Sequence, residues 1–216
     1  MNSSKGTRGL SRTRSTPGTL RVIGGKYRSR LIRVAACPGL RPTPDRVRET
    51  LFNWLGQDLG GLACLDLYAG SGALGFEAAS RGAARVVLVE KDRTAVAQLE
   101  RSRAALGADQ VTIVCSDAAA YLARDHERPG ARPRDHERPG ARPSVRFDVV
   151  FLDPPFRQNA VPEILANLPP RLVEGARVYV ESEVPVAFAA PWTELKRARA
   201  GQVSYQLLRW DSGHAV

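Results

Sequence analysis

The residues from 62 to 75 constrain the fold of this chain more than any others, because they combine a strand, a glycine turn and a helix start. They read Leu-Ala-Cys-Leu-Asp-Leu-Tyr-Ala-Gly-Ser-Gly-Ala-Leu-Gly. The apolar run carries Asp66 near its end, and Gly70, Gly72 and Gly75 follow it. Glycine lets the backbone approach a ligand closely and adopt a positive φ. This order is typical of the entrance to a nucleotide-type site in an α/β fold.

Strand-like and helix-like segments alternate along the rest of the chain. Strands are predicted at 62–67, 84–90, 110–115, 147–152 and 176–182, with helices at 72–81, 92–106, from about 118 to 123 and at 159–168. The end of the chain, from Leu195 to Trp210, reads as a hairpin that turns at Ala200-Gly201. Such alternation predicts an α/β fold with a doubly wound, mostly parallel sheet.

Three consecutive predicted strands each end in an acidic residue, namely Asp66, Glu90 and Asp117. The carboxyl ends of parallel strands meet at one edge of a sheet, so these acids are expected to lie near one another. Glu90 follows Gly70 by 20 residues, where a ribose-binding carboxylate belongs. The alternative interpretation is a buried core with solvated acids at its rim.

The position of Asp66 favours S-adenosylmethionine over a dinucleotide as the ligand. An acid aimed into the glycine turn would repel a pyrophosphate, whereas it would suit the α-ammonium group of this cofactor. Glu90 is then expected at the ribose hydroxyls and Asp117 at the adenine amino group. The other candidates for cofactor contact lie beside these acids: Tyr68, Ala69, Gly70, Gly72 and Ala118. For Tyr68, packing in the core is an equally good interpretation.

A second motif follows the strand predicted at 147–152, where the chain reads Asp153-Pro154-Pro155-Phe156. Proline fixes φ and donates no hydrogen bond, so the carbonyl of Pro154 can remain a free acceptor. Asp153 is a second acceptor when ionised. Two adjacent acceptors can take the two hydrogens of an exocyclic amine, and Phe156 can stack on the ring that carries it. On the tetrapeptide alone, an ordinary proline-rich turn after a strand is as good an interpretation.

The positive charge of the chain is concentrated near its start. Residues 1–50 hold 12 Lys and Arg against two acids, which accounts for the whole net charge of +10. A basic arm of this kind indicates contact with nucleic acid. We expect the arm beside the catalytic edge of the sheet. The candidate RNA contacts are Arg21, Lys26, Arg28, Arg41, Arg46 and Arg48.

The same composition predicts how the chain is divided. Residues 1–18 are expected to form a disordered basic tail. Residues 19–58 are expected to form an RNA-facing extension, in which a small basic β-hairpin precedes a helix that Pro44 opens. Residues 59–216 would form the main domain. Within it, a ten-residue segment at 124–133 is repeated unchanged at 134–143, which predicts a disordered loop at 124–146 without a function of its own.

Cysteine usage and hydropathy argue against a disulfide-rich, zinc-binding or membrane-spanning protein. The three cysteines, Cys37, Cys64 and Cys115, are widely spaced and predict neither a disulfide framework nor a zinc site. No apolar run approaches membrane-spanning length. These features predict a cytoplasmic protein without a metal and without a membrane association.

Together, the glycine loop and the Asp153–Phe156 motif resemble class I S-adenosylmethionine-dependent methyltransferases that modify exocyclic or amide nitrogens. The segments 41–49, Arg-Pro-Thr-Pro-Asp-Arg-Val-Arg-Glu, and 179–183, Tyr-Val-Glu-Ser-Glu, are similar to bacterial 16S ribosomal RNA guanine-N2 methyltransferases of the small subunit. The resemblance covers roughly 19–210. It implies a seven-stranded sheet with an antiparallel C-terminal hairpin, and a monomer that acts on ribosomal RNA in the assembling small subunit. Glu181 and Glu183 are expected to be acids at the rim.

The resemblance implies that Asp153 and the Pro154 carbonyl hold the guanine amine, and that Asp153 can accept its proton. Pockets of this kind receive the base unstacked. Two other functions stay open: an adenine-N6 methyltransferase acting on RNA or DNA, and a non-catalytic RNA-binding module. A separate sequence-reading domain would favour the first, and none is visible. The second predicts loss of an acid at the cofactor edge, where Asp66, Glu90, Asp117 and Asp153 are all present. A protein-glutamine methylase is a weaker alternative, because those relatives usually carry Asn at the position of Asp153.

Overall fold

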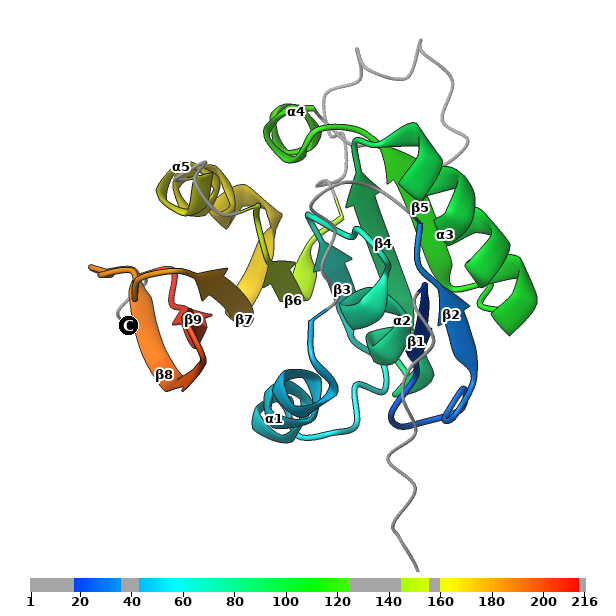
Figure 1. Ribbon diagram of the computed structural model, residues 1–216. Helices are drawn as coiled ribbons and strands as arrows, with labels where there is room; N and C mark the ends of the chain where they lie inside the picture. Colours follow the sequence, from blue (N-terminus) through cyan, green and yellow to red (C-terminus); the bar gives the residue numbers. More distant parts are fainter. Residues whose placement is uncertain (1–17, 36–42, 125–144, 156–159, 214–216) are drawn as a thin grey trace, which may run out of the picture.

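The computed structural model describes residues 18–35, 43–124, 145–155 and 160–213 (Figure 1). In this part of the chain, a seven-stranded sheet has the order β5-β4-β3-β6-β7-β9-β8. The strands are β3 (Ala63–Asp66), β4 (Arg85–Glu90), β5 (Val111–Cys115), β6 (Phe147–Leu152), β7 (Leu172–Ser182), β8 (Trp192–Ala200) and β9 (Val203–Trp210). Strands β3 to β7 pair in parallel, whereas β9 is antiparallel to both β7 and β8. The predicted fold class is therefore confirmed.

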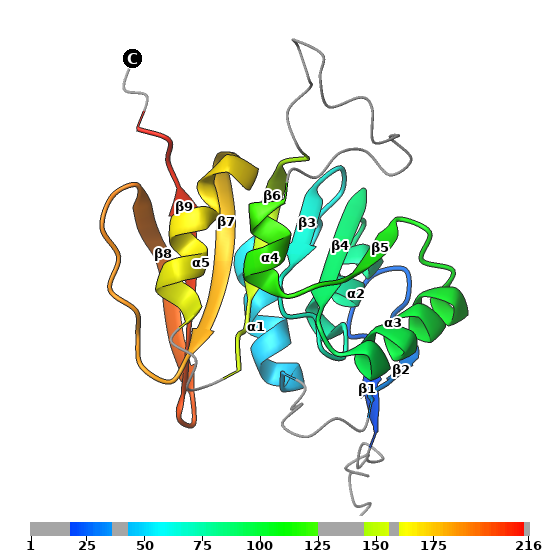
Figure 2. The ribbon, with the colours of Figure 1, turned by 90° about the horizontal axis from the view of Figure 1, so that it is seen from above.

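Helices cover both faces of this sheet, whose strands lie side by side from β8 to β5 in Figure 2. The helices are α1 (Asp45–Leu55), α2 (Ala73–Ser80), α3 (Arg93–Leu106), α4 (Ala118–Ala123) and α5 (Ala160–Asn167), with a short 3-10 turn at Pro169–Arg171. One buried apolar cluster joins the sheet to α1, α2 and α3 through Phe52, Phe76 and Leu99. A second joins the opposite face to α4 and α5 through Tyr121 and Ile164. No helix of the described residues is long and apolar enough to cross a membrane.

Two strands begin several residues before their predicted starts. β7 begins at Leu172 rather than at about 176, although it contains Gly175 at a φ of 74°. Its pairing with β6 shifts register between Phe147 and Val149, and this irregularity accommodates a segment that reads as a turn in the sequence. β8 begins at Trp192, before the predicted Leu195. The tandem repeat beyond Arg124 and most of the N-terminal tail lie outside the described residues.

The predicted N-terminal hairpin is present as β1 (Thr19–Arg21) and β2 (Leu31–Arg33), paired antiparallel. Its apolar side chains, Leu20, Val22, Tyr27 and Ile32, are buried in the same cluster as α1 and α2. The loop between the two strands is held at the end of α2, where the backbone N–H of Lys26 donates to the Ser80 carbonyl at 2.7 Å. The hairpin is therefore packed against the sheet's helical layer.

Glu77, in the middle of α2, is the polar anchor of the hairpin. Its side chain is fully buried and accepts hydrogen bonds from the backbone N–H groups of Ile23 and Gly24, each at 2.8 Å. Arg81 Nε donates to the same carboxylate at 2.8 Å and Arg48 Nη1 at 3.4 Å. A buried carboxylate is tolerated because it is paired and hydrogen-bonded on several sides.

This anchor corrects the prediction that Arg48 contacts RNA. The Arg48 side chain has no exposed surface; it binds Glu77, the Asp45 carboxylate at 2.6 Å and the Arg21 carbonyl at 2.9 Å. A guanidinium held in this way cannot reach a phosphate at the surface. Its role is to join α1 to α2 and to β1.

Candidate active site

The carboxyl ends of five neighbouring parallel strands bring acidic side chains to one edge of the sheet. Asp66 ends β3, Glu90 ends β4, Asp117 follows β5, Asp153 follows β6, and Glu181 lies near the end of β7. The first four are the acids that the sequence placed at this edge. Ligands of open α/β sheets bind at this edge, because the loops that leave the strands form a crevice there.

The glycine loop between β3 and α2 is fixed to the end of β4 by Glu90. One Glu90 carboxylate oxygen accepts the N–H of Gly70 at 2.9 Å, and the other accepts the N–H of Asp92 at 2.8 Å. Gly72 has a φ of 77° and caps α2, a conformation that favours glycine. A Cβ on Gly75 would meet Leu88 Cδ2 at 2.0 Å, so this glycine allows α2 to pack closely on β4. The loop is thus held ready before any ligand arrives.

Asp66 lies beneath this loop with only 2% of its surface exposed. Burial raises its pKa to about 7, although hydrogen bonds from the backbone of Tyr68 and Gly75 act in the opposite direction. The negative charge of Glu90 adds to the increase. A cation placed beside such a carboxyl group lowers its pKa and so favours the ionised form.

Asp117 and Tyr68 lie together on the other side of the loop. Asp117 caps α4, where its Oδ1 accepts the N–H of Ala119 at 2.9 Å. Tyr68 is half-buried, and burial raises its pKa to about 12, with the charges of Asp117 and then Glu163 adding to the effect. Ala69 and Ala118 are buried beside these residues.

The Asp153 motif follows β6 directly. Pro154 is buried, Pro155 is exposed, and Phe156 lies outside the described residues. Burial raises the pKa of Asp153 well above its ordinary value, and the charges of Glu181 and then Asp66 raise it further. Asp153 therefore lies within electrostatic range of two other carboxyl groups.

Glu181 is buried at this edge, so its placement among the rim acids is wrong. It is only 6% exposed, and its Oε1 accepts a hydrogen bond from the Tyr179 hydroxyl at 2.8 Å. Burial raises its pKa, while hydrogen bonds from Tyr179 and Thr43 lower it. The alternation Tyr-Val-Glu in a buried strand was the available signal, because it places Glu181 on the same face as Tyr179. Glu183, by contrast, is exposed as predicted.

The basic residues are not all at this edge. Arg46 is exposed in the first turn of α1, close in sequence to Thr43, which bonds Glu181. Lys26 and Arg28 are exposed on the hairpin loop, which the backbone ties to Ser80 at the far end of α2. The expectation that the whole basic arm lies beside the carboxylates is therefore wrong for this loop. Arg21 is exposed at the end of β1, and Arg41 lies outside the described residues.

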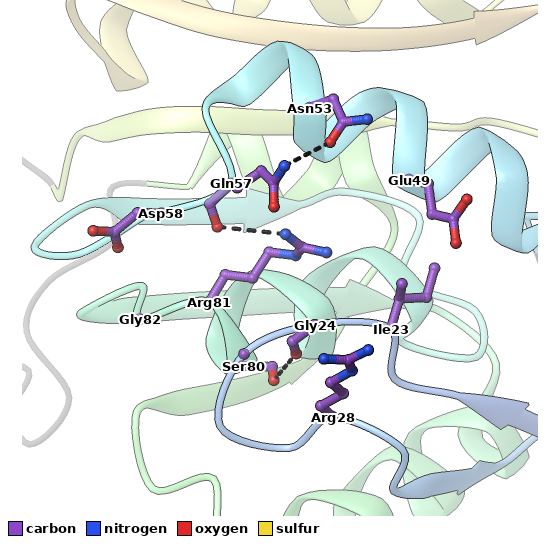
Figure 3. A pocket seen from close by; sticks show the side chains of 11 residues that line it. Ile23, Gly24, Arg28, Glu49, Asn53, Gln57, Asp58, Ser80, Arg81 and Gly82 are labelled. Atoms are coloured by element: carbon purple, nitrogen blue, oxygen red, sulfur yellow. Dashed lines mark hydrogen bonds between the residues drawn. The ribbon is translucent and has the colours of Figure 1, made fainter.

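A pocket of about 700 Å³ lies near the hairpin loop (Figure 3). Its walls come from the end of α1, the end of α2 and the hairpin loop, and they include Arg28, Glu49, Asn53, Asp58 and Arg81. Because Asp58 precedes β3 and Arg81 precedes β4, the pocket is at the amino edge of the sheet. It is separate from the carboxylates at the opposite edge.

Comparison with known proteins shows that the chain is similar to ribosomal RNA methyltransferases of the small subunit. Residues 20–209 match the family model described as Conserved hypothetical protein 95. The chain is 41% identical to Ribosomal RNA small subunit methyltransferase D of Escherichia coli, over 92% of this chain and 93% of the relative. It is 38% identical to the protein of the same name from Haemophilus influenzae, over 90% and 96% of the two chains. The solved structure of yhhF from Escherichia coli, 41% identical, superposes with a TM-score of 0.75 over 90% of this chain and 99% of the other.

Proposed function

The chain belongs to the Conserved hypothetical protein 95 family, together with the ribosomal RNA small subunit methyltransferase D proteins, and on this premise we propose that it methylates ribosomal RNA. More specifically, we propose that it transfers a methyl group from S-adenosylmethionine to the exocyclic N2 amine of a guanine in the small-subunit RNA. The position of Asp153 carries the specific proposal. This carboxyl group lies at the same sheet edge as the glycine loop and within the electrostatic influence of Asp66.

The donor set at this edge fits S-adenosylmethionine. Asp66, Glu90 and Asp117 surround the glycine loop, and acidic groups of this kind suit a ligand with a cationic amino acid end and no phosphate. When bound, the cofactor supplies a methyl group from a sulfonium centre. We assign Asp66 to its ammonium group, Glu90 to its ribose hydroxyls and Asp117 to its adenine amino group. Tyr68, Ala69, Gly70, Gly72 and Ala118 would complete the walls of the cofactor site.

Asp153 and the carbonyl of Pro154 would hold the two N–H bonds of the target amine. An exocyclic amine is a poor nucleophile because its lone pair is delocalised into the ring. Two fixed acceptors rotate the lone pair out of that conjugation and aim it at the methyl group, so that positioning supplies most of the rate. Pro155 stiffens the turn that holds them, and Phe156 would stack on the unstacked base.

The exposed basic side chains would position the RNA backbone without reading its sequence. Arg46 and Arg21 would contact the RNA backbone, and Lys26 and Arg28, on the loop at the far end of α2, would contact RNA farther from the target base. We propose that the substrate is ribosomal RNA in the assembling small subunit, and that the protein acts in the cytoplasm as a monomer.

The test is methyl transfer from labelled S-adenosylmethionine to three substrates: deproteinised ribosomal RNA, small subunits from cells that lack the enzyme, and duplex DNA. The product nucleoside is identified by mass spectrometry, with the Asp153→Asn variant as the control for contaminating activity. We expect N2-methylguanosine from a ribosomal substrate. N6-methyladenine would overturn the assigned base while keeping the chemistry, and absence of any product with cofactor still bound would contradict the proposed activity.

A further inference from the structure

Glu181 is a buried carboxylate at the catalytic edge that the proposed reaction leaves without a role. We propose that Glu181 is a positioning residue that acts through Asp153: it holds a negative charge beside Asp153, so that Asp153 takes up the proton released by the methylated amine. The inference rests on the proposed function and deepens it, because it identifies what makes Asp153 an effective proton acceptor.

The sheet register places the two carboxylates next to each other. Leu152 of β6 pairs with Val180 of β7 in a parallel ladder, so the residues that follow them, Asp153 and Glu181, occupy adjacent positions. Adjacent strands lie about 5 Å apart, and paired residues of a parallel ladder point to the same face. Phe151 and Tyr179, two residues earlier, share that face and the same buried cluster. The two carboxyl groups therefore lie side by side above an apolar floor.

The groups around Glu181 favour its ionised form over that of Asp153. Tyr179 Oη donates to Glu181 from its own strand at 2.8 Å, and the Thr43 hydroxyl donates from the segment before α1. From β9, Tyr205 pairs with Glu181 in the ladder and its ring lies 6.3 Å from that of Tyr179. The charge facing Asp153 from β3 is that of Asp66, which is also negative.

Two carboxylates this close share their protons unequally. Glu181 receives the hydrogen bonds, whereas the charges of Glu181 and Asp66 both raise the pKa of Asp153, which burial has already raised. Asp153 is thus the stronger base of the two.

The proton balance of the reaction agrees with this assignment. Methylation forms an N–C bond as the S–C bond of the sulfonium breaks, and the electron pair of that bond stays on sulfur. The nitrogen then loses one proton. The site loses the positive charge of the sulfonium at the step in which the carboxylate pair gains the proton, so its total charge does not change.

The test is the pH dependence of methyl transfer in a single turnover, measured on ribosomal substrate for the wild-type protein and three variants. Glu181→Gln removes the neighbouring charge, so we expect the acidic limb of the profile to move down by about one pH unit or more, with a slower plateau. Tyr179→Phe removes a hydrogen bond that stabilises Glu181 as an anion. Glu181 then carries less negative charge beside Asp153, so the limb should also move down, by less than in Glu181→Gln. Glu183→Gln is the matched control, because this exposed acid lies two residues away; its limb should coincide with that of the wild type.

If Glu181→Gln slows methyl transfer but leaves the acidic limb at the same pH, the role of Glu181 is purely structural and the inference is overturned. If Glu181→Gln is inactive at every pH, Tyr179→Phe decides: a downward shift of its acidic limb supports the inference, and an unchanged or raised limb overturns it. A wild-type protein that methylates no ribosomal substrate at any pH would instead contradict the proposed function.

Discussion

Asp153 is a carboxyl group in a place where ionisation is costly. It is partly buried, and two other acids act on it through space. In a free site it holds its proton more firmly than a surface aspartate does. A cationic ligand beside it would lower its pKa again, so the carboxyl group becomes ionised and able to take a proton when the cofactor is bound.

Replacing Asp153 with Asn should separate chemistry from binding. The amide keeps the shape of the side chain but cannot take a proton, so we expect the methyl-transfer rate to fall by about 10²–10⁴-fold. Affinity for S-adenosylmethionine should change little, because the proposed cofactor contacts lie on β3, β4 and α4. Single-turnover kinetics and calorimetric titration measure the two quantities. Equal loss of both would contradict the role assigned to Asp153.

Asp66 should make cofactor binding depend on pH. Its pKa of about 7 lies above the ordinary 3.8, so below pH 7 the free protein carries a proton that the cofactor's ammonium group would displace. We therefore expect the affinity for S-adenosylmethionine to rise from pH 6 to pH 7, approaching about tenfold per unit below the pKa. Without ligand, the same shift lowers stability as the pH rises from about 4 to about 7.

The control is Asp66→Asn, which cannot exchange a proton in this range. The affinity of this variant for S-adenosylmethionine should be lower, and it should no longer rise between pH 6 and pH 7. A wild-type affinity that stays constant from pH 6 to pH 7 would show that Asp66 does not meet the ammonium group.

At the scale of helices and strands, neighbouring arginines of α1 have opposite environments. Arg46 is exposed, whereas Arg48, two residues later, is fully buried between Asp45 and Glu77. Arg48→Met should lower the free energy of unfolding by about 3 kcal/mol, because it removes one partner of a buried ion pair. Arg46→Met should change it by less than about 0.5 kcal/mol. Urea denaturation followed by circular dichroism measures both.

RNA affinity should rank the same two variants in the reverse order. Arg46→Met should weaken binding of the ribosomal substrate, whereas folded Arg48→Met should bind normally at a temperature well below its unfolding transition. If Arg48→Met destabilises the protein no more than Arg46→Met does, the structural role given to Arg48 is wrong.

The strands, the glycine turn and four of the five edge acids could be predicted from sequence, because each depends on residues close together in the chain. Apolar runs set the strands, and parallel strands share an edge by topology. Arg48 could not be placed in this way, since its partner Glu77 is 29 residues away and on another helix. Glu181 was misplaced for a similar reason: its burial depends on β9 and on the segment before α1, which the strand's own sequence does not reveal.

At the scale of the whole molecule, the N-terminal segment presents two groups of exposed positive charge, one around Arg46 and one on the hairpin loop with Lys26 and Arg28. The double variant Lys26→Glu and Arg28→Glu should weaken RNA binding and reduce the slope of log K against log salt by about 1 for each lost phosphate contact. The rate at saturating substrate should stay unchanged, because the loop is at the far end of α2. Affinity measured over a series of salt concentrations tests this.

The matched control is Lys196→Glu with Arg199→Glu on β8, the strand at the other margin of the sheet. It makes the same change in total charge, so an equal loss of affinity would mean that the hairpin loop has no special part in RNA binding.

The buried Glu77 carboxylate has a consequence for the speed of RNA capture. It fixes the backbone at Ile23 and Gly24, so the loop that presents Lys26 and Arg28 has its shape before RNA arrives. A surface formed in advance needs no folding during the encounter, so charge attraction can set the association rate directly. We therefore expect the protein to make a rapid first contact with RNA at this loop and to select the base in a later, slower step at the carboxylate edge.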